Sequence, residues 1–186
     1  GGPRNYGNAF LPSIHQGTAV GRAGNPDDAR IRNIDNAMLS SAQRKSRFDY
    51  MQSLNALQLN TAGADDGMEA TVKNYELAWR MQMEAPELTD LSGETEATKK
   101  IYGIGEKATN SFGKQCLLAR RMVERGVRYV SVNYSDESNN PRWDQHSNMP
   151  KHAEHARNTD KPVAGLIRDL KARGLLEDTL VWWGGE

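Results

Sequence analysis

The stretch SFGKQCLLARRMVERGVRYVSVNY, residues 111–134, decides the fold that the sequence predicts. Its first part carries apolar residues at helical spacing and ends at Gly126, the residue type that commonly terminates a helix. Its second part, VRYVSVNY, is rich in the β-branched and aromatic residues that favour strands. We therefore predict a helix over 111–125 and a strand over 127–133.

The same order of elements recurs before the C-terminal end of the chain. DKPVAGLIRDLKARG, residues 160–174, predicts a helix over 161–173, with Asp160 as N-cap, Pro162 in the first turn and Gly174 as the stop. TLVWW, residues 179–183, predicts a second strand. Helix, strand, helix and strand in this order indicate a βαβ crossover, in which the two strands are parallel. The predicted fold class is therefore α/β, with a mainly helical segment before the sheet.

The predicted organisation is a single region with three parts. Residues 1–39 are rich in Gly, Pro, Asn and Asp and predict loops, residues 40–105 predict a helical accessory layer, and residues 106–186 form the βαβ part. Within the accessory layer we predict helices near 41–60 and 67–84, the second ended by Pro86, and a short third helix within 90–103. The first two are expected to pack through Leu54, Leu57, Trp79 and Met83.

Composition excludes several classes of protein. Lys and Arg together number 24, as do Asp and Glu, so the formal net charge is zero. This balance argues against a general nucleic-acid binder, which needs an excess of clustered basic charge. No apolar run approaches the length of a membrane span. The single cysteine, Cys116, forbids an internal disulfide and is expected to be buried and inert on the apolar side of its helix.

Three of the four histidines lie in PRWDQHSNMPKHAEH, residues 141–155. Asp144 and His146 are two residues apart, so on an extended backbone their side chains point in roughly the same direction and could share a divalent metal. His152 is a further candidate ligand, and Glu186 follows the second predicted strand. Because ligands bind beyond the carboxyl ends of the strands in open α/β sheets, the crossover predicts that these groups meet at one sheet edge.

The other polar residues are interpreted as solvated or structural and not as metal ligands. His155 is expected to be solvated, His15 to be structural or on the surface, and Asp136 and Glu137 to be solvated, with their position after a strand keeping them as weak candidates. For His152 the solvated and the ligating interpretations are close. Trp143 is expected to anchor the loop by packing. The sequence contains no nucleophile elbow, P-loop or Cys-x-x-Cys pair that would indicate another chemistry.

Several stretches together resemble one bacterial family, the sulfatase-like proteins of domain of unknown function 1501. They are FLPSIHQGTAV, YELAWRMQMEAPEL, FGKQCLLARRMVERGVRYVSV, WDQH and DKPVAGLIRDLKARGLLEDTLVWWGGE. The resemblance implies membership of the alkaline phosphatase superfamily and part of its α/β sandwich with parallel strands. It also implies a metal-dependent hydrolase of sulfate or phosphate esters that acts on a small ester such as a sulfated or phosphorylated saccharide. Its metal would be Zn²⁺, Mn²⁺, Ca²⁺ or Mg²⁺.

The resemblance places part of the site outside this sequence. In the family, Trp-Asp-x-His matches Trp143, Asp144 and His146, whereas the nucleophile precedes the position of Gly1 and the continuation of Gly-Gly-Glu follows Glu186. We therefore expect a fragment truncated at both ends and inactive alone, from a parent protein that is periplasmic or secreted. The alternative is a non-catalytic binding or scaffold relative that keeps the fold without the chemistry.

Overall fold

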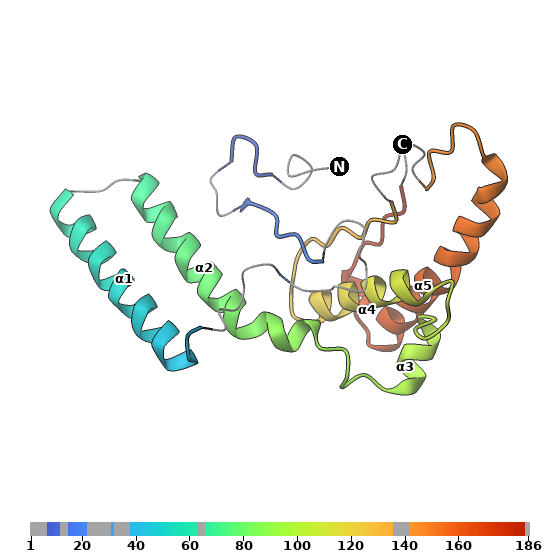
Figure 1. Cartoon of the computed structure of the whole chain (residues 1–186), viewed down its shortest axis with the longest axis horizontal. Helices are drawn as coiled ribbons and strands as arrows, with labels where there is room; N and C mark the ends of the chain where they lie inside the picture. Colours follow the sequence, from blue (N-terminus) through green and yellow to red (C-terminus); the bar gives the residue numbers. More distant parts are fainter. Residues whose placement is uncertain are drawn as a thin grey trace. The chain divides into compact units, whose positions relative to one another are not determined.

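The computed structural model describes residues 7–11, 15–21, 31, 38–62, 66–135 and 142–184. Its elements are the helices α1 (Ser41–Ala62), α2 (Asp66–Thr89), α3 (Glu96–Ile101), α4 (Asn110–Glu124) and α5 (His152–Ala172), with short 3-10 helices η3 (Met149–Lys151) and η4 (Leu176–Asp178) (Figure 1). The chain divides into two compact units. The first contains α1 and α2 as far as Glu87, and the second contains residues 88–184 of the described chain.

The predicted α/β fold with parallel strands is wrong for this structure. Residues 127–133 and 179–183 have no strand partner, and the β pairing within the described ranges is a single antiparallel bridge between Val20 and Ile31. The α/β sandwich that the resemblance implied is therefore not observed, and the described chain is mainly helical. The physical reason is that β-branched and aromatic residues favour a half-buried pleated surface and do not by themselves supply a neighbouring strand to pair with.

The segment after α4 nevertheless lies against the helices with alternating side chains. Val130, Val132 and Tyr134 are partly buried, whereas Ser131 and Asn133 between them are exposed. Val132 and Tyr134 contact the buried cluster of the second unit. The two-residue periodicity of VRYVSVNY therefore correctly indicates which side chains turn inward, although the backbone forms no ladder.

The first unit contains a helical hairpin whose inner face differs from the prediction. The two helices are present, but Leu54, Leu57 and Met83 are exposed. The contact is made by Phe48, whose ring stacks on Trp79 with centroids 4.9 Å apart, and by Gln52, whose amide donates to Glu76 Oε1 at 3.2 Å. Pro86 does not end the second helix, because α2 continues through it to Thr89.

The inner face of α1 consists of five half-buried residues at helical spacing, Arg44, Phe48, Gln52, Asn55 and Leu59. At 100° per residue, Tyr50, Leu54 and Leu57 lie on the opposite side of the same helix. α1 thus has two faces that carry apolar residues. The face with Phe48 and Leu59, which also contains the polar Gln52 and Asn55, is turned toward α2. Aromatic stacking and the amide–carboxylate bond decide the choice, and the leucine-rich stripe is left toward solvent.

In the second unit, α4 and α5 lie side by side and enclose the core (Figure 1). Tyr102, Phe112, Cys116 and Leu117 form its buried cluster. The expectation for Cys116 is confirmed, and burial raises the pKa of its thiol to about 12. At this pKa the thiol stays protonated at neutral pH and is a poor nucleophile.

Both long helices of this unit end as the sequence predicts. Gly126 and Gly174 have φ values of +82° and +72°, and each follows a helix whose last carbonyls accept bonds from the turn. Val127 N–H donates to Met122 O at 3.0 Å and Leu175 N–H to Leu170 O at 2.9 Å, the bonds of a glycine-terminated helix. The predicted helix over 161–173 is present, but α5 begins at His152, so Asp160 and Pro162 lie inside it.

Two glycines let the chain cross closely between α4 and α5. A β-carbon at Gly113 would collide with the carbonyl of Tyr102, and one at Gly165 would lie 2.5 Å from Ile101 O and 3.1 Å from Tyr102 Cα. The backbone of residues 101–102 therefore packs against α4 at Gly113 and against α5 at Gly165, two positions where the helix carries no side chain. This close approach fixes α3, which is only six residues long, on the two larger helices.

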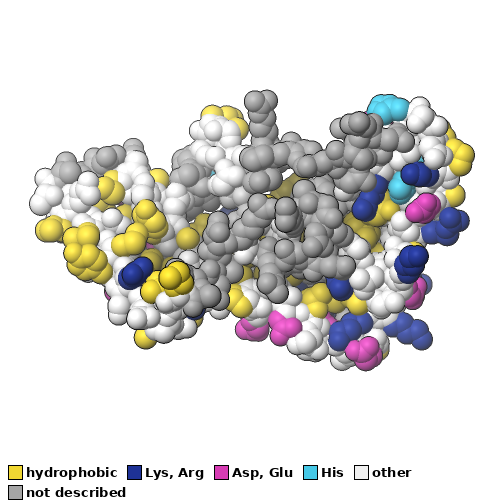
Figure 2. All heavy atoms as spheres, viewed as in Figure 1, with side chains coloured by type: hydrophobic (Ala, Val, Ile, Leu, Met, Phe, Trp, Pro, Cys, Tyr) yellow, Lys and Arg dark blue, Asp and Glu magenta, His cyan; other side chains and the backbone are white. Residues whose placement is uncertain are grey.

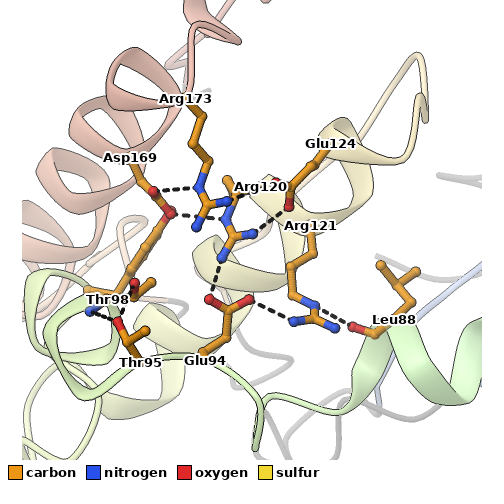
Figure 3. Close-up of polar contacts among 10 residues, drawn as sticks. Leu88, Glu94, Thr95, Thr98, Arg120, Arg121, Glu124, Asp169 and Arg173 are labelled. Carbon is orange, nitrogen blue, oxygen red and sulfur yellow. Dashed lines mark hydrogen bonds and ion pairs between the residues drawn. The ribbon is translucent and has the colours of Figure 1, made fainter.

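A buried network of ion pairs joins the same elements (Figure 3). The side chain of Arg120 is 2% exposed, and its three nitrogens lie 2.6–2.9 Å from oxygens of Glu94, Glu124 and Asp169. Arg121 adds a second bond to Glu94 at 2.7 Å, and Arg173 bonds both Glu124 and Asp169 at 2.8 Å. Three guanidinium groups thus face three carboxylates, so the network is neutral and connects α4, α5 and the loop before α3.

The environment holds these groups in their charged forms. Burial opposes ionisation of Glu94, but its bonds to Arg121 and Arg120 outweigh burial and hold the pKa of that carboxyl below its usual range. Burial and the neighbouring carboxylate of Asp169 raise the pKa of Tyr102. Tyr102 therefore stays protonated, and its hydroxyl donates to Asp169 Oδ2 at 3.0 Å.

Candidate metal site

The histidine-rich segment connects the extended stretch after α4 to the start of α5. Residues 142–148 are irregular, with bends at 142–143 and 146–147, Pro150 lies in the single turn η3, and α5 starts with His152. The segment therefore passes from irregular backbone to helix between His146 and His152. This change in backbone determines which of the candidate ligands can meet.

Asp144 and His146 are brought together as the sequence predicts. Nε2 of His146 lies 3.1 Å from Oδ2 of Asp144, and the two side chains are 67% and 53% exposed. The pair is therefore open to a solute. A two-residue spacing on irregular backbone has placed a nitrogen and an oxygen donor on the same side of the loop.

His152 has a different partner. Its Nε2 lies 2.8 Å from the carbonyl oxygen of Trp143, and its ring is tilted on that indole with centroids 5.8 Å apart. Because a carbonyl oxygen only accepts hydrogen bonds, this nitrogen carries the proton and is not a metal ligand in this arrangement. His152 holds the backbone that immediately precedes Asp144.

His155 is buried, so the expectation that it is solvated is wrong. Its ring makes edge contacts with Tyr134 and Trp143, and Nδ1 lies 3.2 Å from the Tyr134 hydroxyl. Nε2 faces the side-chain amide nitrogen of Gln145 at 3.5 Å. An amide nitrogen only donates, so these contacts fit a neutral ring that accepts at Nε2 and donates from Nδ1.

The surroundings of His155 favour the uncharged ring. Burial lowers its pKa from the ordinary value of 6.5, and Arg142, His152 and Lys151 act in the same direction, while Glu154 opposes them. The guanidinium of Arg142 lies over the Tyr134 ring, 4.5 Å from its centroid. The loop that carries Asp144 and His146 is thus anchored to α5 through a neutral imidazole. Trp143 contributes by packing, with its ring near those of Tyr134, His152 and His155.

We expect acid to weaken this anchor. Because the pKa of His155 is lower in the folded chain than its ordinary value of 6.5, the unfolded chain binds a proton there more readily than the folded chain does. The free energy of unfolding should therefore fall as the pH decreases below 6.5. His155→Gln should reduce the loss of stability, because glutamine cannot be protonated. Denaturant unfolding one pH unit above and one below 6.5 measures the effect.

The control for this experiment is His15→Gln, since His15 is an exposed histidine far along the chain from the loop. The His15 variant should keep the pH dependence of the wild type. An unchanged pH dependence in the His155 variant would show that the ring does not resist protonation.

Some candidates lie outside the described residues, namely Glu186, Asp136 and Glu137. Within the part of the chain that the structure describes, no three His, Cys, Asp or Glu side chains gather in a way that could hold a metal. The residues that sequence reasoning missed are His155 and the network around Arg120. A signal for Arg120 exists, because it continues the buried stripe of Phe112 and Cys116 by one further helical turn.

Comparison with known proteins places the chain in one family. Residues 1–186 match the family described as protein of unknown function (DUF1501), and the chain belongs to this family. No curated protein and no solved structure matches the chain. Among the helices of the described ranges, none combines the length and the apolar character that a membrane crossing requires.

Proposed function

We propose that this chain supplies Asp144 and His146 as ligands of a divalent metal in a hydrolase of sulfate or phosphate esters. The observation that carries the proposal is the separation of 3.1 Å between His146 Nε2 and Asp144 Oδ2 on an exposed loop. The family resemblance of the Trp-Asp-x-His segment supports the same pair. The substrate that we propose is a small ester such as a sulfated or phosphorylated saccharide.

The distance between the two atoms fits a shared ion. Oxygen and nitrogen ligands lie about 2.0–2.2 Å from Zn²⁺, so two of them at a tetrahedral angle are about 3.3–3.6 Å apart. The observed pair is slightly closer, as a hydrogen-bonded pair is, and needs only a small side-chain rotation to bind one ion. Metal binding at His146 Nε2 leaves the proton of a neutral ring on Nδ1, whereas a doubly protonated ring would have to release one proton to the solvent.

The donor types narrow the choice of metal. A mixed pair of imidazole nitrogen and carboxylate oxygen suits Zn²⁺ or Mn²⁺ better than Mg²⁺ or Ca²⁺, which prefer oxygen ligands alone. Such an ion would stabilise negative charge on a sulfuryl or phosphoryl oxygen. Two ligands are fewer than a stable site needs, so further ligands are required, and we propose Glu186 as one of them. His152 could join through Nδ1 while its Nε2–H stays bonded to the carbonyl of Trp143, the usual arrangement of a ligating histidine.

The remaining residues of the loop position the pair. His152 bonds the Trp143 carbonyl, and Gln145, between the two ligands, is buried and donates to Arg142 O at 3.1 Å. The inward direction of Gln145 turns Asp144 and His146 outward on either side of it. We propose that the nucleophile comes from outside this sequence and that the parent protein is exported, as the family resemblance implies.

His146→Ala and Asp144→Asn should each weaken Zn²⁺ or Mn²⁺ binding by more than the roughly 10–100-fold that loss of an outer hydrogen-bond partner of a ligand costs. Titration calorimetry in two buffers of different ionisation enthalpy measures both the affinity and the protons released. At a pH low enough to protonate an ordinary imidazole, fewer protons should be released by the His146 variant than by the wild type.

His15→Ala is the matched control, because it removes an exposed imidazole elsewhere in the chain. It should bind metal as the wild type does. Equal affinity in the His146 variant and the wild type would reject the ligand role. A wild-type chain that binds neither Zn²⁺ nor Mn²⁺ would show that the proposed ligands Asp144, His146 and Glu186 do not form a site by themselves.

A further inference from the structure

Gln145 connects the loop that carries Asp144 and His146 to α5. Its side chain is buried, and its amide nitrogen donates to Arg142 O at 3.1 Å and lies 3.5 Å from His155 Nε2. An amide nitrogen carries two hydrogens, so one can be donated to the carbonyl and the other to the ring. We call these two contacts the Gln145 bridge.

The Gln145 bridge requires a neutral His155. A protonated imidazole carries a hydrogen on both nitrogens, so Nε2 would then face the amide nitrogen as a second donor. Two buried donors that face each other leave both unsatisfied, which is unfavourable. The amide would therefore turn to present its oxygen to the ring, and Arg142 O would lose its donor.

Groups on every side of His155 affect its protonation. Burial lowers its pKa from the ordinary value of 6.5, and three positively charged or protonatable neighbours act in the same direction, namely Arg142, His152 and Lys151. Glu154 opposes them, and Tyr134 contacts the ring from the extended stretch after α4. Figure 2 shows histidine side chains at the surface of the second unit, beside Lys and Arg side chains. The ring should therefore take up a proton only in weak acid.

We propose that protonation of His155 breaks the Gln145 bridge and thereby releases the part of the loop that holds Asp144 and His146 together. Gln145 lies between these two residues, and its inward direction turns them outward. Once its amide has turned, the 3.1 Å approach of His146 Nε2 to Asp144 Oδ2 is held less firmly. His152 still bonds the Trp143 carbonyl, so the motion is confined to the residues after Trp143.

The Gln145 bridge makes the candidate metal site sensitive to pH through a residue that is not one of its proposed ligands. For metal binding this inference rests on the proposed function, whereas the motion of the loop does not depend on it. Coupling between two sites is reciprocal, so a proton at His155 should weaken Zn²⁺ binding by the same factor as bound Zn²⁺ weakens proton binding. We expect a factor of about 10, the lower end of the range for loss of an outer hydrogen bond at a metal site.

NMR titration of the metal-free whole chain between about pH 5 and about pH 8 tests the motion, because this range spans the pKa of an ordinary imidazole. The signals to follow are those of each imidazole, of the Gln145 side-chain amide and of the backbone amides of residues 142–146. The Gln145 and loop signals should change with the midpoint of His155, which should lie below 6.5.

Two substitutions of Gln145 separate the bridge from simple packing. Gln145→Met keeps the length of the side chain without the amide, so the loop signals should no longer follow His155. Gln145→Glu places a carboxylate at the ring, which accepts from protonated Nε2, so the midpoint of His155 should rise above that of the wild type. His15→Gln is the control and should change neither the midpoint nor the loop signals, because His15 is exposed elsewhere in the chain.

Zn²⁺ titrations above and below the His155 midpoint test the coupling. In weak acid the wild type should lose about 10-fold more affinity than Gln145→Met does. An equal loss in both proteins would overturn the coupling. Loop signals that ignore His155, or that follow only His146 or His152, would overturn the bridge itself. A loop that follows His155 in a chain without affinity for Zn²⁺ would confirm the bridge and show that Asp144 and His146 form no site by themselves.

Discussion

Arg120→Ala should lower the free energy of unfolding of the second unit by about 3–5 kcal/mol, the usual cost of removing one partner from a buried ion network. The side chain of Arg120 is 2% exposed and touches three carboxylates, so its loss leaves Glu94, Glu124 and Asp169 with an excess of negative charge. Arg173 and Arg121 remain and compensate only in part (Figure 3). Denaturant unfolding, with hydrogen exchange of the α4 and α5 amides, measures the effect.

The matched control for Arg120 is Arg168→Ala, which removes an exposed arginine from α5. This change should alter stability by no more than about 0.5 kcal/mol. If the two variants were equally stable, the network would contribute nothing to holding α4 and α5 together, and the packing of Tyr102 and Leu117 alone would account for the core.

Gly113→Ala should also destabilise the second unit, by about 1–3 kcal/mol or more, through overpacking. The added methyl group would collide with the carbonyl of Tyr102, which is backbone and cannot rotate away as a side chain can. The better helix propensity of alanine offsets about 1 kcal/mol of this cost. Thermal and denaturant unfolding give the net change.

Gly93→Ala is the control, and we expect it to raise the stability of the protein where Gly113→Ala lowers it. No atom lies within 4 Å of a β-carbon at Gly93, and its φ is not in the left-handed region. Alanine there should stabilise the protein by up to about 1 kcal/mol, because it restricts the unfolded chain. A stabilising effect at both positions would show that the chain at Tyr102 can move away from α4.

Local signals in the sequence predicted the five helices and the C-terminal ends of α4 and α5, but not the start of α5 at His152 or the continuation of α2 through Pro86. Gly126 and Gly174 end α4 and α5. A glycine does this by adopting a left-handed backbone conformation, which depends on no residue distant in the sequence. The failures depend on partners distant in sequence. VRYVSVNY and TLVWW have the composition of strands, but pairing needs a neighbour that composition cannot provide. Leu54 and Leu57 formed the more obvious apolar stripe, yet stacking with Trp79 selected Phe48 instead.

The candidate site shows the same division. The proximity of Asp144 and His146 follows from a spacing of two residues, so the sequence alone predicted it. The burial of His155 depends on Tyr134, twenty-one residues earlier, and on the ring of Trp143. The burial of His155 also depends on the start of α5 at His152. The helix turns the side chain of His155 inward and places Nε2 of His152 within 2.8 Å of the Trp143 carbonyl oxygen.

The buried ion network and the two glycine contacts have a consequence for how Asp144 and His146 can be substituted. None of the residues that make them lies between Gly126 and Met149, the segment that carries Asp144 and His146. Substitutions at Asp144 and His146 should therefore leave intact the contacts that hold α4 and α5 together, so variants of the pair can be compared on one unchanged scaffold.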